Sequence, residues 1–406
     1  MKKHSWVNIS VIVVALGYFV DIFDLTLFNM VRVASLESLG IPKDQLVDKG
    51  VLLLNSQMAG MLLGGLFWGV LGDRKGRLGV LFGSIILYSV ANILNAFVQD
   101  IPQYMILRFI SGIGLAGELG AGITLIAEIL PKEVRGMGTA LVATIGVFGA
   151  VFGGLVVELL PWRVAYVVGG VLGLLLLLLR VKVIDSSLFH EKKKAHETAR
   201  WGSLRYLFSD ADRVKRFFYC VGIGVPIWFV AGLLMAFSPE LAASIGVTDP
   251  ILASRTIAIS YLGLGFGDLF SGFISQILKS RKKAILYFKL ASFLIAGLIL
   301  FTTAAKSSLY YYTLCFLIGV AAGYWAIFVT TAAEQFGTNL RATVATSVPN
   351  FVRGSVIPMT LLFKYLKDGQ GILGAMVIVG VIAFAIGTIS SILIPESFHK
   401  DLDYVE

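Results

Sequence analysis

The chain has 406 residues, of which 57% are hydrophobic and only 15% are charged, and its mean hydropathy is +0.84. Soluble domains contain roughly 45–50% apolar residues, so this composition excludes an ordinary globular enzyme. The formal net charge of +9 does not indicate nucleic-acid binding, because the Lys and Arg residues stand between apolar runs.

Twelve apolar runs are long enough to cross a bilayer, which takes about 20 helical residues. They lie near 6–33, 49–72, 78–98, 102–129, 135–159, 162–183, 214–237, 251–278, 282–304, 307–335, 343–366 and 370–394. The sequence therefore predicts an all-α membrane protein of twelve transmembrane helices. The first run is too long for a cleavable signal peptide, so we expect it to remain as the first helix.

The basic residues predict the orientation of these helices. Most of the 34 Lys and Arg residues fall in one set of loops, which includes both termini, the turn at 74–77 and the segment 180–216. The basic side of a membrane protein is the cytoplasmic side. We therefore expect a multi-pass protein of a bacterial-type inner membrane, with both termini in the cytoplasm.

One sizeable polar stretch, 184–213, divides the twelve runs into six and six. It contains Glu191-Lys192-Lys193-Lys194. This stretch is either a solvated connector or a patch that attracts anionic lipids, at roughly 1 kcal/mol per basic residue. The predicted domains are an N-terminal six-helix bundle at 1–183, a cytoplasmic linker at 184–213, and a C-terminal six-helix bundle with a short tail at 214–406.

The two bundles carry matching sequence patterns. Ala127-Glu128 is followed seven residues after the Glu by Arg135, and Ala333-Glu334 is followed at the same interval by Arg341. Such repeats predict two pseudo-symmetric halves around a central site near the bilayer midplane.

A charged turn from Gly69 to Arg77 joins the second and third runs, and its density of charge and glycine requires an aqueous loop. It resembles the loop motif G-x-L-x-D-R-x-G-R of the major facilitator superfamily, and the stretch 108–117 resembles the helix-four motif of that superfamily. The resemblance implies two bundles that alternate in access. It also implies a cytoplasmic latch that holds the outward-open state, formed by Gly69, Asp73, Arg74, Gly76 and Arg77.

Three shorter patterns point to different branches of the superfamily. Asp21-Ile22-Phe23-Asp24 is similar to the acidic pair of the metabolite, aromatic-acid and phosphate proton symporters. Pro395-Glu396-Ser397 and Trp162-Arg163 are similar to patterns of sugar porters. The glycine-rich fifth run resembles an exporter motif, but Ala150 stands where that motif has proline, and glycines at such spacing also serve simple helix packing.

Four acidic residues lie inside predicted spans and away from the span ends, where burial favours the neutral form of a carboxyl group and makes protonation a usable switch. Asp21 and Asp24 share a face of helix one and are the first candidates for proton coupling, with a structural ion pair as the alternative. Glu118 in helix four is the second candidate. Asp268 in helix eight has either a coupling role or a capping or gating role.

Helix eleven carries a polar stripe at helical spacing, formed by Thr346, Asn350, Arg353, Thr360 and Lys364. A guanidinium near the midplane is costly unless it meets an anion, and its fork suits carboxylate or phosphate. Arg353, Asn350 and Thr346 are therefore candidate substrate-binding residues. The alternative partner for Arg353 is an acid of helix one.

Aromatic residues could line the same site. Tyr324, Trp325 and Phe328 in helix ten and Trp228 in helix seven are candidates, although such residues are also common in packed cores. Arg108, carried over from the helix-four motif, would either assist proton transfer or extend to the membrane surface.

These patterns together predict a secondary transporter that moves a small organic anion by alternating access, coupled to proton symport. A sugar or polyol symporter and a proton-driven exporter are the alternatives. Neither a catalytic nor a metal-binding constellation is apparent, and no phosphate-binding loop appears, so we expect no enzyme activity and no cofactor. The expected partners are the substrate, protons and membrane lipid, and not nucleic acid.

Overall fold

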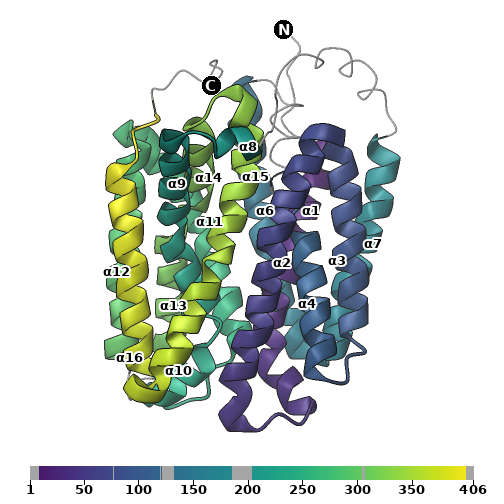
Figure 1. The fold of residues 1–406 in the computed structure, drawn as a ribbon. Helices are drawn as coiled ribbons and strands as arrows, with labels where there is room; N and C mark the ends of the chain where they lie inside the picture. The colour runs from purple at the N-terminus through teal and green to yellow at the C-terminus, as the bar shows by residue number, and fades with distance from the viewer. Residues whose placement is uncertain are drawn as a thin grey trace.

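The computed structural model describes residues 9–75, 77–118, 120, 132–184, 204–303 and 307–398. Within these residues the protein is an all-α bundle of membrane-crossing helices in two halves. Figure 1 shows the halves side by side, with the purple-to-blue N-terminal half against the green-to-yellow C-terminal half. The fold class expected from the sequence is confirmed.

The N-terminal half is built from long apolar helices joined by short loops. Its helices are α1 (Ile9–Ser38), the short η1 (Lys43–Gln45), α2 (Leu46–Lys75), α3 (Arg77–Asn95), α4 (Ile101–Leu115), α6 (Lys132–Leu159) and α7 (Trp162–Ile184). We call the end of the bundle where α1 begins the terminal face, and the other end, which holds the loop after Ser38, the opposite face.

The C-terminal half contains more interruptions. Its helices are α9 (Ala211–Phe229), the π-helical turn η2 (Val230–Leu234), α10 (Ser238–Ile245), α11 (Ala253–Leu278), α12 (Arg281–Thr302), α13 (Ser308–Ala322), α14 (Trp325–Glu334), α15 (Thr338–Gly354) and α16 (Val356–Leu393), preceded by the short α8 (Leu204–Leu207). The helix α9 begins three residues inside the predicted linker, and most of that linker, 185–203, lies outside the described residues.

The seventh and tenth membrane passages differ from the single straight helices expected. The seventh passage changes from α-helix to π-helix at η2 and continues through α10 to Ile245, beyond its predicted end at 237. The tenth, expected as one helix over 307–335, breaks between α13 and α14. The eleventh and twelfth meet at Gly371, whose φ of 69° suits a residue without a side chain and turns the chain back within α16.

Within the described part of the chain, nine helical stretches are long and apolar enough to cross a membrane, and the one over Thr343–Leu393 contains both passages that meet at Gly371. Large apolar side chains such as Leu159, Phe301 and Phe273 are more than 60% exposed around the outside of the bundle. Such a surface suits contact with lipid.

The two halves meet along a seam in which α2 packs on α15 and α16, and α11 packs on α6 and α1. Figure 1 shows α2 and α15 next to each other at this seam. The seam contains the polar stripe predicted on helix eleven, and so it positions the candidate site.

Candidate substrate and proton-coupling site

Arg353 lies at the centre of the seam, on α15, with its side chain 1% exposed. Its Nη2 is 3.9 Å from Oδ2 of Asp21 on α1, and its Nη1 donates to Oδ1 of Asn350 at 3.3 Å. Its Nε has no hydrogen-bond partner among the described residues. The guanidinium is therefore buried with spare donor capacity and with its carboxylate neighbour beyond hydrogen-bond distance.

The remaining stripe residues also face the N-terminal half. Asn350 Nδ2 donates to the carbonyl oxygen of Ala116 at 3.0 Å. Thr360 Oγ1 donates to Oδ1 of Asn55 at 2.6 Å, and Lys364 Nζ is 4.0 Å from Oδ1 of Asp48. A side chain at Gly120 would collide with Thr346. The 3.6-residue period thus places the whole stripe along the seam.

Two of the predicted aromatic residues stand beside Arg353. The guanidinium carbon is 5.8 Å from the ring centroid of Trp228, on α9, and 6.0 Å from that of Trp325, on α14. The Trp325 ring lies 5.1 Å from Phe328. Tyr324 is directed elsewhere, because its hydroxyl donates to the carbonyl of Ile223 at 3.4 Å and its ring lies 5.9 Å from Lys289 Nζ.

The acidic pair of α1 is fully buried. Asp21 and Asp24 both have 0% exposure, and neither Asp21 oxygen makes a hydrogen bond to a described residue. Asp21 faces the seam and Arg353. Asp24 lies against α7, where a side chain at Gly169 would collide with its Oδ1. The i, i+3 spacing therefore brings one acid to the seam and the other to the interior of the N-terminal half.

Glu118 is tightly paired, unlike Asp21. Arg180 of α7 donates from Nη2 to Oε2 at 2.9 Å and from Nη1 to Oε1 at 3.2 Å, and Ser84 donates to Oε1 at 2.9 Å. Sequence reasoning missed this partner, since Arg180 follows a leucine run at a span end and was counted among the loop residues. This bidentate geometry is typical of a structural ion pair, and proton coupling at Glu118 stays a prediction.

Arg108 is buried and does not extend to the membrane surface. Its Nη1 donates to the hydroxyl of Tyr166 at 3.2 Å, and that hydroxyl is 2.6 Å from the hydroxyl of Tyr104. Tyr104 in turn donates to Ser35 at 3.4 Å. These side chains tie α4 to α7 and α1. The two tyrosines were not predicted, because aromatic residues in apolar helices give no signal of such a network.

Asp268 on α11 accepts a hydrogen bond at Oδ1 from the backbone N–H of Ala326 at 3.0 Å. This hydrogen bond has the geometry of a helix cap, and the coupling and gating roles of Asp268 stay predictions. The capped helix is α14, which carries Trp325.

A family model of the Major Facilitator Superfamily matches residues 14–359. The chain belongs to this superfamily. It is a secondary transporter of that family and not an enzyme.

Named relatives and a solved structure agree with this membership. The chain is 26% identical to a probable 4-methylmuconolactone transporter of Cupriavidus pinatubonensis, over 98% of this chain and 91% of the relative. It is 25% identical to the cis,cis-muconate transport protein of Acinetobacter baylyi, over 97% and 95%. The crystal structure of a D-xylose-proton symporter matches with a TM-score of 0.71 at 15% identity, covering 98% of this chain and 100% of that one, and shows the shared fold.

Motif residues of this Major Facilitator Superfamily member that the structure describes lie at the terminal face. Glu334 pairs with Arg281 at 3.3 Å and accepts from Ser397 at 2.7 Å, and Arg341 Nε donates to the carbonyl of Ala333 at 3.3 Å. Gly69 lies beside Ser347 across the seam. Gly76, Glu128 and the side chains of Asp73, Arg74, Arg77 and Arg135 lie outside the described residues, so the latch stays a prediction.

The opposite face of the transporter carries ion pairs between the halves that sequence reasoning did not find. Arg32 pairs with Glu240 at 2.7 Å, Arg255 with Glu158 at 2.8 Å, and Lys367 with Asp48 at 3.0 Å. Each joins residues far apart in sequence, for which a single sequence gives no pairing signal. These contacts close the opposite face.

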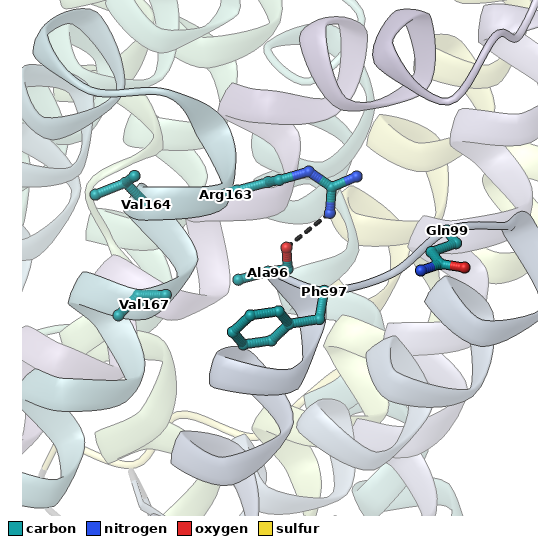
Figure 2. A pocket seen from close by; sticks show the side chains of 6 residues that line it. All are labelled: Ala96, Phe97, Gln99, Arg163, Val164 and Val167. Atoms are coloured by element: carbon teal, nitrogen blue, oxygen red, sulfur yellow. Dashed lines mark hydrogen bonds between the residues drawn. The ribbon is translucent and has the colours of Figure 1, made fainter.

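A shallow pocket at the opposite face of the N-terminal half is separate from the seam (Figure 2). Arg163 of α7 donates there to the carbonyls of Ala96 at 2.7 Å and Val98 at 3.0 Å. Its guanidinium carbon also lies 4.3 Å from the ring centroid of Trp162. The Trp162-Arg163 pattern thus anchors the end of α3 on α7, and the guanidinium is already occupied by protein carbonyls.

Proposed function

We propose that this transporter is a proton symporter that carries a small organic anion across the inner membrane by alternating access. The observation that carries the proposal is the environment of Arg353, which is buried at the seam, has an Nε without a hydrogen-bond partner in the described part of the chain, and has an acid at 3.9 Å. A buried cation with spare donors is costly unless an anion completes its coordination. A carboxylate can do so with paired, charge-assisted hydrogen bonds.

The aromatic residues favour an organic anion with a flat apolar part. Trp228 and Trp325 place ring surfaces beside the guanidinium, so a ligand that binds Arg353 through its carboxylate brings its carbon skeleton against these rings. Relatives named for muconate and for a muconolactone support this chemical class for the present chain.

In this proposal Asp21 and the substrate share one cation, Arg353, and coupling follows from that sharing. An ionised Asp21 holds Arg353, whereas a protonated Asp21 leaves the guanidinium to the incoming anion. Proton and anion therefore enter the site together, and Asp24 supplies a second buried carboxyl group on the same helix. Opening the opposite face requires the ion pairs of Arg32, Arg255 and Lys367 to separate. We assign the basic terminal face to the cytoplasm because basic loops favour that side.

Substrate-induced proton flux in proteoliposomes tests this function. A pH-sensitive dye sealed inside should report acidification when cis,cis-muconate is added outside, and D-xylose should give none. Acidification with D-xylose and none with cis,cis-muconate would show that the substrate is a sugar and not an organic anion. Alkalinisation inside on muconate addition would show exchange instead of symport and favour the exporter alternative.

A further inference from the structure

We propose that Asp268 is a positioning residue that fixes the break in the tenth membrane passage and thereby sets the aromatic wall of the substrate site. The proposal rests on the proposed function in so far as Arg353 and this wall bind the substrate. Among the described residues Asp268 forms no ion pair, and its hydrogen bond is to the backbone of α14, so its role is exerted through that backbone.

The break exposes backbone donors at membrane depth. The helix α13 ends at Ala322, and α14 begins at Trp325 after Gly323 and Tyr324 leave helical geometry, with ψ values of 59° and 22°. The first N–H groups of a helix have no partner within it, and lipid offers none. Tyr324, at the cap position, makes no side-chain capping bond.

Asp268 supplies that missing cap from another helix. Its Oδ1 accepts from Ala326 N at 3.0 Å, so a carboxylate on α11 takes the place of the Ser, Thr or Asp that usually precedes a helix. A negative group at a helix N-terminus also interacts favourably with the helix dipole.

Close glycine packing holds Asp268 at this depth. Gly263 and Gly267 of α11 face Gly319 of α13 and Gly323, which directly follows α13, and a side chain at any of the four would collide with the facing backbone. The two backbones are therefore in direct contact just before Asp268, and α11 has little freedom to slide along α13.

The cap acts next to the site. Ala326 directly follows Trp325, whose ring lies 6.0 Å from the Arg353 guanidinium and 5.1 Å from Phe328. Loss of the cap would free the first turn of α14 and let the Trp325 ring leave Arg353. Asp268 thus couples the α11–α13 contact to the geometry of the substrate wall.

The chain contains a matched control on the same broken passage. Asp249 Oδ2 accepts from Ser308 N at 2.9 Å at the start of α13, outside the membrane, so it too is a carboxylate that caps a helix from elsewhere. Removal of this cap affects α13, whereas Trp325 lies on α14.

The test compares Asp268→Ala, Asp268→Asn, Asp268→Glu and Asp249→Ala in the full-length protein. The fluorescence emission of Trp325 is obtained as the difference between each variant and its Trp325→Phe counterpart. It reports the surroundings of this ring in the aromatic wall without any ligand. We expect Asp268→Ala to shift this emission and to weaken cis,cis-muconate binding about tenfold. Asp268→Asn, which keeps an acceptor oxygen, and Asp249→Ala should leave both readouts at native values.

Each alternative outcome has a distinct meaning. An unchanged Trp325 emission in Asp268→Ala would overturn the proposal. Should that variant fail to fold, Asp268→Asn and Asp268→Glu decide: positioning predicts that Asn retains proton-driven uptake better than Glu, and a coupling carboxylate predicts the reverse order. If the native protein binds no organic anion while the emission still responds to Asp268→Ala, the proposed function fails and the positioning role stands.

Discussion

Two carboxylate–arginine pairs, one inside the N-terminal half and one at the seam, have the same chemistry and opposite geometry. Glu118 and Arg180 form two hydrogen bonds, at 2.9 Å and 3.2 Å, whereas Asp21 and Arg353 approach only to 3.9 Å. Both pairs are almost fully buried, so solvent does not explain the difference. We infer that Arg180, whose donors are used within one half, holds helices together, and we propose that Arg353, which keeps spare donors between the halves, is available to a ligand.

The largest expected effect is the loss of stability on substitution of Glu118, the acid of the tightly bonded pair. Glu118→Gln leaves Arg180 buried without a counter-charge, which typically costs about 3–5 kcal/mol of stability. Thermal unfolding of the purified variant should show a correspondingly large loss. If the variant keeps native stability but loses proton-driven uptake, Glu118 takes part in proton coupling and is not a structural residue.

Substitution of Arg353 tests whether this residue binds the anion. Arg353→Lys keeps the charge but not the fork, and Arg353→Ala removes both, so anion affinity should fall in the order native, Lys, Ala. The loss for Ala should be roughly 1.5–3 kcal/mol, or about 10- to 150-fold in Kd. Titration calorimetry with cis,cis-muconate measures it. Native affinity in Arg353→Ala would make this residue a structural partner of Asp21, as Arg180 is of Glu118.

The opposite face extends the contrast to ion pairs that separate during transport in the mechanism we propose. Glu240→Gln removes the acid that holds Arg32, and so the population should shift toward a state open at this face. Spin labels at the exposed Ser38 and Ser244 should show a longer distance in the variant. Asp73→Asn, at the predicted latch, should not lengthen this distance, and identical distributions in the native protein and Glu240→Gln would contradict the role of the pair.

The smallest effect concerns Glu396 at the terminal face. Partial burial alone would raise the pKa of this carboxyl group, but hydrogen bonds from Ser280 and from the backbone of Phe398, Arg281 and Ser397 hold the pKa below its usual value. Its stabilising contribution is therefore present above the ordinary pKa and is lost as the pH falls through the lowered folded value. Glu396→Gln should lower stability at pH 7 by less than about 1 kcal/mol, because the group is largely exposed. Unfolding curves of both proteins at pH 7 and pH 3 should converge at the lower pH, and an equal gap at both would contradict this linkage.

Hydrophobic run length and helical period were enough to predict the fold class and the seam-facing stripe. The stripe from Thr346 to Lys364 is local, so its register follows from the sequence alone. The break at Gly323 and Tyr324 was not predicted, because the apolar run continues through it and its cap, Asp268, comes from another helix.

The partners of buried charges could not be predicted for the same reason. Arg180 ends an apolar run and gives no sign that it turns inward to Glu118. The aromatic candidates Tyr324 and Trp325 are adjacent in sequence, and only the start of α14 decides which of the two rings faces Arg353.

We propose that Asp21 and the transported anion share Arg353. Proton-driven accumulation and equilibrium exchange of labelled cis,cis-muconate, measured in the same proteoliposomes for the native protein and Asp21→Asn, test this sharing. We expect that Asp21→Asn, which cannot release a proton, abolishes accumulation driven by a pH gradient and retains part of the exchange. Undiminished accumulation in Asp21→Asn would contradict it.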